Sequence, residues 1–357
     1  MTKILSTTID NIANNITELI GNTDLLRINS LSDLTGCEIL LKCEQQNPGG
    51  SIKDRAALQL VKDAVESGLL KPGMTIVEGT AGNTGIGLAL VAKAFGFNML
   101  AVMPKGQAKE KEQMIALYNA QLLLVDSCPF ADKKHFYHTA KRLGELHTDY
   151  WWADQFENTS NCKAHYLNTG PEIWQQTQGN IDALVSVVGT GGTIAGNSWY
   201  LSEKNPQLQT WLVDPYGSGI YNYLKTGKYQ ASGSSFTEGI GIMRCVDNFL
   251  QAKINKAIRL PDQDLVTISR ELSQLDGILL GSSSALNVAG ALYAAAKMGP
   301  GKTIVTFCCD LAERSYSKLY NPTFLNEKKI ITDHENLASM LARYQAEPST
   351  AVIEVNQ

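Results

Sequence analysis

The stretch Asn47-Pro-Gly-Gly-Ser-Ile-Lys-Asp-Arg55 most constrains this chain, because it joins a strand to a helix around one lysine. Residues 38–44 form a short apolar strand pattern, and residues 56–65 carry apolar side chains at helical spacing. Lys53 is therefore predicted at a helix N-terminus, where the helix dipole and the nearby Arg55 favour a neutral amine. A neutral amine can attack a carbonyl, although a surface lysine in a first turn explains the stretch alone more simply.

Length, charge and cysteine content restrict the class of protein. A chain of 357 residues with 44% hydrophobic composition can bury two cores, and a net charge of -4 argues against nucleic acid as a partner. We expect no membrane partner and no secretory signal, because no long apolar run or leader pattern is present. Seven cysteines without paired zinc spacing favour a cytoplasmic protein without a metal site.

Strand and helix patterns alternate along most of the chain, which predicts mostly parallel sheets with helices on both faces. Two such series predict two α/β domains with a cleft between them. We expect residues 38–158 to form a smaller, mobile, substrate-binding domain. Residues 1–37, starting with a helix, and residues 159–330 would form the larger domain, and residues 331–357 a C-terminal extension or docking helix.

Two loops between a strand and a helix are suited to anions. In Gly189-Thr-Gly-Gly-Thr193, backbone N–H groups, hydroxyls and the helix dipole can hold a phosphate. Thr80-Ala-Gly-Asn-Thr84 can hold a carboxylate in the same way, and Asn83 can donate to an oxygen on a ring. A tight turn or a helix cap explains either loop equally well when it is taken alone. One amine and two anion loops together indicate pyridoxal 5'-phosphate (PLP) bound beside an amino acid.

The motifs around these loops resemble the cysteine synthase (O-acetylserine sulfhydrylase)/cystathionine β-synthase family. They are the lysine stretch, the two loops and three further segments: Gln155-Phe156, Thr169-Gly-Pro-Glu-Ile-Trp174 and Gly239-Ile-Gly241. The resemblance runs from about residue 15 to 325 with the motifs in order. It implies fold-type II of the PLP enzymes: two three-layer α/β/α domains, tryptophan synthase β-like, with PLP between them. It also implies a homodimer.

The resemblance implies a role for each matching residue. Lys53 would form a Schiff base with PLP and move protons at the substrate α-carbon. The ring and phosphate contacts would be Asn83, Leu311, Gly189, Thr190, Gly191, Gly192 and Thr193. The substrate contacts would be Thr80, Ala81, Gly82, Thr84, Gln155 and Gly239.

Two positions depart from the family pattern. Ala81 replaces a serine, which removes one hydroxyl donor. Leu311 stands where a serine would face the pyridine nitrogen, and leucine cannot form a hydrogen bond. A contact from Ser282, Ser283 or Ser284 could replace it, or catalysis could be weakened.

The resemblance implies a PLP-dependent β-replacement that makes L-cysteine from O-acetyl-L-serine and sulfide through an aminoacrylate. A cysteine desulfhydrase, which releases sulfide, pyruvate and ammonia, is the close alternative, because a longer branch of the family includes such enzymes. A catalytically weakened PLP-binding protein with a regulatory role is a second alternative. The resemblance also implies a serine acetyltransferase C-terminal peptide as a possible partner. The absence of a dinucleotide fingerprint argues against a dehydrogenase.

Overall fold

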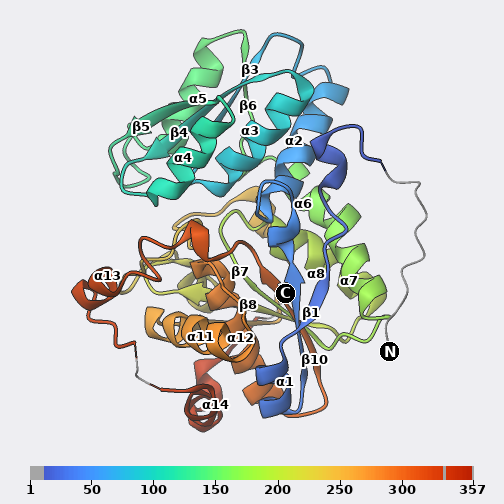
Figure 1. The fold of residues 1–357 in the computed structure, drawn as a ribbon, viewed down its shortest axis with the longest axis vertical. Helices are drawn as coiled ribbons and strands as arrows, with labels where there is room; N and C mark the ends of the chain where they lie inside the picture. The colour runs from blue at the N-terminus through green and yellow to red at the C-terminus, as the bar shows by residue number, and fades with distance from the viewer. Residues whose placement is uncertain (1–11, 333–334, 356–357) are drawn as a thin grey trace.

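The computed structural model describes residues 12–332 and 335–355, which form two β-sheets with helices on their faces (Figure 1). The expected two-domain α/β architecture is confirmed. The N-terminal helix was predicted from Ile9 to Ile20; its first three positions lie outside the described range, and Ile16–Leu19 form a single 3₁₀ turn. None of the helices in the described ranges is long and apolar enough to cross a bilayer.

The larger sheet has the strand order β1-β2-β10-β7-β8-β9-β11 among the described residues. Neighbours from β2 to β9 are parallel, and the two edge strands β1 and β11 are antiparallel to theirs. Side chains alternate between the two faces: Ile304 packs into the core on one face and Val305 into the core on the other. The strands are β1 Leu25–Arg27, β2 Glu38–Cys43, β7 Ala183–Val187, β8 Gln209–Pro215, β9 Lys256–Leu260, β10 Thr303–Cys308 and β11 Ile353–Glu354.

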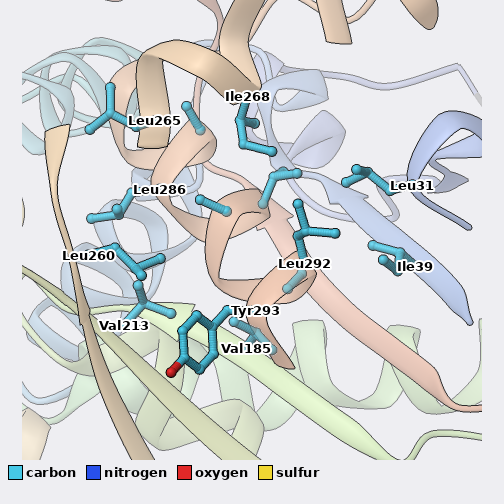
Figure 2. Packing of buried hydrophobic residues seen from close by; sticks show 14 of the residues in the cluster. Leu31, Ile39, Val185, Val213, Leu260, Leu265, Ile268, Leu286, Leu292 and Tyr293 are labelled. Carbon is cyan, nitrogen blue, oxygen red and sulfur yellow. The ribbon is translucent and has the colours of Figure 1, made fainter. Parts of the chain in front are cut away.

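Helix α12 (Ser282–Met298) is the centre of the main core, on one face of this sheet (Figure 2). Its residues from Ser282 to Ala295 are all buried, because α1, α11 and α14 cover the side that does not face the strands. Gly290 allows the close approach, since a Cβ there would lie 2.2 Å from Val213 Cγ2. The covering helices are α1 Asn29–Thr35, α11 Asp262–Leu275 and α14 Leu337–Ala346.

The opposite face is covered by α7 (Gly170–Gln176) and α8 (Gly192–Lys204), which pack apolar residues against β7 and β10. A π-helical turn, His165–Thr169, joins α7 to the preceding helix α6 (Ser160–Ala164). The remaining short helices around this body are α9 Ile220–Thr226, α10 Asp247–Leu250 and α13 Pro322–Glu327.

The smaller sheet is fully parallel, with the order β5-β4-β3-β6 (β3 Thr75–Gly79, β4 Asn98–Pro104, β5 Gln121–Val125, β6 Tyr150–Trp152). Helix α5 packs on one face, and α2, α3 and α4 pack on the other. These helices are α2 Lys53–Glu66, α3 Asn83–Phe95, α4 Lys109–Leu117 and α5 Phe136–Leu146.

Strand β2 corrects the predicted start of the smaller domain. It pairs with β10 over six registered residues and with β1 over three, so it belongs to the larger sheet. An isolated run of apolar residues shows that a strand forms, but its neighbours come from distant parts of the chain. The segment after residue 330 is integrated into the larger body, because α14 packs on α12 and β11 extends the sheet beside β9.

Candidate active site

A cavity of about 350 Å³ lies between the two sheets and is lined by residues of both bodies. Loops that follow β3 and β7 open into it at the carboxyl ends of these strands, where parallel sheets place their binding sites. Twelve predicted site residues line it: Lys53, Thr80, Ala81, Gly82, Asn83, Thr84, Gln155, Gly189, Thr190, Gly191, Thr193 and Gly239. Gly192 and Leu311 are absent from the lining among the described residues.

Lys53 is the first residue of α2 and its side chain lines the cavity. Within residues 12–332 and 335–355, no side chain forms an ion pair or hydrogen bond with its Nζ. Burial lowers the pKa of Lys53, and Cys309, Asp310 and Glu44 only partly offset this. The amine is thus prepared to act as a nucleophile toward an aldehyde.

Arg55 does not contribute to this shift as the sequence suggested, because its charge is neutralised. Its Nε lies 2.6 Å from Glu44 Oε2, and its Nη2 lies 2.7 Å from Glu172 Oε2. Lys42 Nζ, fully buried, also contacts Glu172 Oε2 at 2.7 Å. This network joins β2, α2 and α7, and it holds the first turn of α2 that carries Lys53.

The loop at residues 189–193 forms an anion cradle. The backbone N–H groups of residues 190–193 have no hydrogen-bond partner in the described structure, and they lie at the N-terminus of α8. Gly189 is required here, because a Cβ would lie 2.1 Å from the carbonyl oxygen of Gly239. Asn161 Nδ2 donates to Thr190 Oγ1 at 2.8 Å, and His165 Nε2 lies 3.3 Å from Thr193 Oγ1.

The loop at residues 80–84 has the same architecture at the N-terminus of α3. Thr80 Oγ1 accepts from the N–H groups of Gly82 and Gly85, at 3.0 and 3.2 Å, which shapes the turn. The N–H groups of Ala81, Asn83 and Thr84 remain without a partner among the described residues. Gly82 has a φ of 144°, and a Cβ there would lie 2.3 Å from Lys111 Cδ.

Gln155 is held beside this loop by buried contacts. Its Nε2 donates to Glu78 Oε1 at 3.0 Å and to the carbonyl oxygen of Gly79 at 2.9 Å. Its Oε1 accepts from Thr84 Oγ1 at 2.5 Å. Burial raises the pKa of Glu78 to about 8, and the neighbouring Asp154 adds to the shift. Glu78 therefore supports the orientation of Gln155, a role that no motif in the sequence indicated.

The side chains that α12 and the end of β10 contribute to the cavity differ from the predicted one, Leu311. Leu311 packs against the main core and forms an isolated bridge with Leu280, so its side chain is not a cavity residue. Ser283 and Cys309 line the cavity instead. Asn83 Nδ2 donates to Asp310 Oδ2 at 2.6 Å, and its Oδ1 is buried without a partner. Leu311, the predicted ring contact, is therefore not in the cavity lining, whereas Ser283, one of the three serines considered, is.

Aromatic side chains and Arg244 line the other side of the cavity. The Arg244 guanidinium lies 4.6, 4.5 and 5.1 Å from the ring centres of Phe130, Tyr137 and Phe156, and it pairs with Glu157. His135 is half-buried and also lines the cavity. Apart from Phe156, these residues come from segments without a motif, and sequence spacing alone does not indicate them.

The site fits PLP, because the cavity has room for a pyridine ring. It also presents the half-buried amine of Lys53, the phosphate cradle at residues 189–193 and the Asn83 amide oxygen, which has no partner among the described residues. The fold and this site define a PLP-dependent enzyme of fold-type II.

Comparisons with known proteins agree. A family model described as pyridoxal-phosphate dependent enzyme matches residues 16–310. Cysteine synthase from Dictyostelium discoideum is 44% identical over 339 residues, covering 91% of this chain and 89% of that protein. This chain belongs to the cysteine synthase/cystathionine β-synthase family of PLP-dependent enzymes.

Solved structures are similar over nearly the whole fold. O-acetyl serine sulfhydrylase isoform 3 from Entamoeba histolytica has a TM-score of 0.82 at 30% identity, covering 97% of this chain and all of that chain. A hydrogen sulfide-producing enzyme from Fusobacterium nucleatum has a TM-score of 0.77 at 32% identity, covering 85% of this chain and 99% of that chain.

Proposed function

We propose that this protein is a cysteine synthase that makes L-cysteine from O-acetyl-L-serine and sulfide. The observation that carries the proposal is the convergence of Lys53, the 80–84 loop and the 189–193 loop on one cavity. The names of its relatives, cysteine synthase and O-acetyl serine sulfhydrylase, support the same activity.

The residues act in three groups. The N–H groups and hydroxyls at 189–193 hold the cofactor phosphate, and Gly192 contributes through its backbone. The 80–84 loop, with Gln155 beside it, binds the substrate carboxylate, so that the α-carbon faces Lys53. When bound, PLP supplies an electron sink conjugated to that carbon. Lys53 Nζ holds the cofactor aldehyde before substrate arrives and afterwards moves the α-proton.

The group that contacts the pyridine nitrogen bears on the choice of reaction. We propose that Ser283 donates a hydrogen bond to the ring nitrogen, since it lines the cavity and Leu311 does not. A hydroxyl leaves this nitrogen uncharged, which suits a β-elimination with a good leaving group such as acetate. Ser283→Ala should shift the visible absorbance of the bound cofactor, and Leu311→Ser, the matched control outside the cavity, should not. The opposite pattern would return the contact to position 311.

The direction of the reaction is tested by product analysis. Purified protein is supplied with O-acetyl-L-serine and sulfide, or with L-cysteine alone, and cysteine, pyruvate and sulfide are quantified by mass spectrometry and colorimetry. We expect cysteine formation to exceed sulfide release by at least about tenfold. Dominant pyruvate and sulfide release would favour a cysteine desulfhydrase, the alternative supported by the similar hydrogen sulfide-producing enzyme.

Lys53→Ala is the negative control for both reactions. It should lose turnover and the visible absorbance of the lysine-bound cofactor together. Full activity in this variant would refute the role of Lys53. Catalytic silence of the intact protein with every β-substituted alanine, despite bound PLP, would favour a regulatory PLP-binding protein.

Four further proposals concern the assembly, its setting and its motion. We propose a homodimer, as the family resemblance implies; light scattering gives the mass. We propose a cytoplasmic protein, because its seven cysteines are all free thiols. We also propose that the active-site cleft accepts a serine acetyltransferase C-terminal peptide, which a peptide titration monitored by cofactor fluorescence would test. Finally, we propose that the smaller domain closes over the substrate.

A further inference from the structure

His165 lies directly behind the phosphate cradle and has no role in the family motifs described above. It begins the π-helical turn His165–Thr169 and is 1% exposed. Its Nδ1 lies 2.9 Å from Thr169 Oγ1, and its Nε2 lies 3.3 Å from Thr193 Oγ1. Thr193 lines the cavity, whereas His165 does not. The three side chains thus form a line from the turn to the cradle.

The imidazole ring of His165 is neutral. Burial lowers its pKa well below the usual value of 6.5, and the positive charges of Arg55 and Lys53 add to this. Among the groups that affect this pKa, Glu172 alone raises it, and its effect is smaller than the combined lowering. A neutral imidazole has one N–H donor and one acceptor nitrogen, so its two contacts must have opposite polarity.

Only one of the two tautomers suits a bound phosphate. If Nδ1 carries the proton, Nε2 accepts the Thr193 hydroxyl proton, and Thr193 turns only lone pairs toward the anion. If Nε2 carries the proton, it donates to Thr193 Oγ1, and the Thr193 O–H is free to point into the cradle. In this second case Thr169 donates its hydroxyl proton to Nδ1.

We propose that His165 is a positioning residue that aims the Thr193 hydroxyl at the cofactor phosphate, with Thr169 holding the ring in its Nε2–H form. The proposal rests on the assignment of the 189–193 loop to the phosphate and not on the reaction catalysed.

A parallel contact on the other threonine of the cradle supports this polarity. Asn161 Nδ2 donates to Thr190 Oγ1 at 2.8 Å, and it also donates to the carbonyl oxygen of Gln155 at 2.8 Å. The second acceptor identifies this atom as the amide nitrogen, so Thr190 receives a hydrogen bond from behind and keeps its own proton for the cavity. His165 in the Nε2–H form gives Thr193 the same arrangement.

The test is a double-mutant cycle on cofactor affinity. PLP dissociation constants are measured by equilibrium dialysis and visible absorbance for the intact protein, His165→Phe, Thr193→Ala and the double variant. We expect His165→Phe to weaken PLP binding about tenfold, as for the loss of one oriented hydrogen bond to a charged group. In the Thr193→Ala background, the same change should weaken binding less than about twofold.

Several outcomes would overturn the proposal. An equal loss in both backgrounds would mean that His165 acts only on the fold. An unchanged affinity of Thr193→Ala would show that the phosphate lies elsewhere, which is a failure of the proposed site itself. His147→Phe, the same exchange at an exposed position, is the matched control and should leave the affinity unchanged.

Two further measurements keep the proposal testable if the phenylalanine variant folds poorly. His165→Gln, whose amide can donate at the same place, should retain PLP affinity within about threefold. In ¹⁵N-histidine-labelled holoprotein, the His165 signals should show a proton on Nε2 and none on Nδ1, and Thr169→Val should weaken this preference. A protonated Nδ1 in the holoprotein would refute the proposed polarity.

Discussion

Glu78 offers a direct test of the electrostatics behind the 80–84 loop. Its carboxyl group is fully buried and is contacted by the backbone N–H and the side-chain amide of Gln155, at 3.4 and 3.0 Å. Burial raises its pKa from 4.5 to about 8, because the charged form loses its hydration. The folded protein therefore binds this proton more tightly than the unfolded chain does.

The sign of the effect follows from linkage. Between pH 4.5 and about pH 8 the folded state holds a proton that the unfolded state has released, so stability falls as pH rises through this window. For a single group with these two pKa values, the loss from about pH 6 to about pH 9 is on the order of 3 kcal/mol. Glu78→Gln cannot ionise and should escape this loss.

Urea unfolding of the intact protein and of Glu78→Gln at these two pH values measures the effect. We expect the stability difference to move in favour of the variant by about 3 kcal/mol as pH rises. Asp214→Asn is the control, because burial raises the pKa of Asp214 only to about 6 and Glu78 is not among the groups that shift it. The pH window in which this carboxyl group affects stability lies lower. Between about pH 6 and about pH 9, the stability difference between the intact protein and this control variant should therefore change by well under about 1 kcal/mol. Parallel pH profiles for the intact protein and Glu78→Gln would refute the reasoning.

Three other substitutions test the cradle and the core. Gly189→Ala should abolish PLP binding in an absorbance titration, because the new Cβ would lie 2.1 Å from the Gly239 carbonyl oxygen; unchanged affinity would mean that the loop is free to move. Tyr344→Phe should lower the free energy of unfolding by about 1–3 kcal/mol, since its hydroxyl donates to the buried Asp264 at 2.6 Å. Trp211→Ala should cost about 3–5 kcal/mol, because its ring is fully buried; a loss below about 1 kcal/mol in urea unfolding would contradict either assignment.

Local sequence predicted much of the site. The start of α2 at Lys53, and the 80–84 and 189–193 loops at strand ends, follow from turn residues and apolar spacing over short stretches. These features depend on contacts between residues close in sequence, so patterns of a few residues are sufficient to indicate them.

Positions that depend on distant partners were predicted less well. Strand β2 joined the larger sheet because β10, some 260 residues later, supplies its hydrogen bonds. His135 faces the cavity because α5 packs against the smaller sheet, and Arg244 is held by three aromatic rings and a carboxylate from other segments. None of these contacts leaves a periodic signal.

The sequence by itself determined that an amine and two anion-binding turns occur at strand–helix junctions, and so the cofactor class. Only the tertiary structure decided that they share one cavity, that Ser283 and not Leu311 reaches it, and that Glu78 and His165 support it from behind. The reason is physical. Backbone turns are set by neighbouring residues, whereas burial and the pKa and orientation of a side chain are set by whatever the fold packs around it.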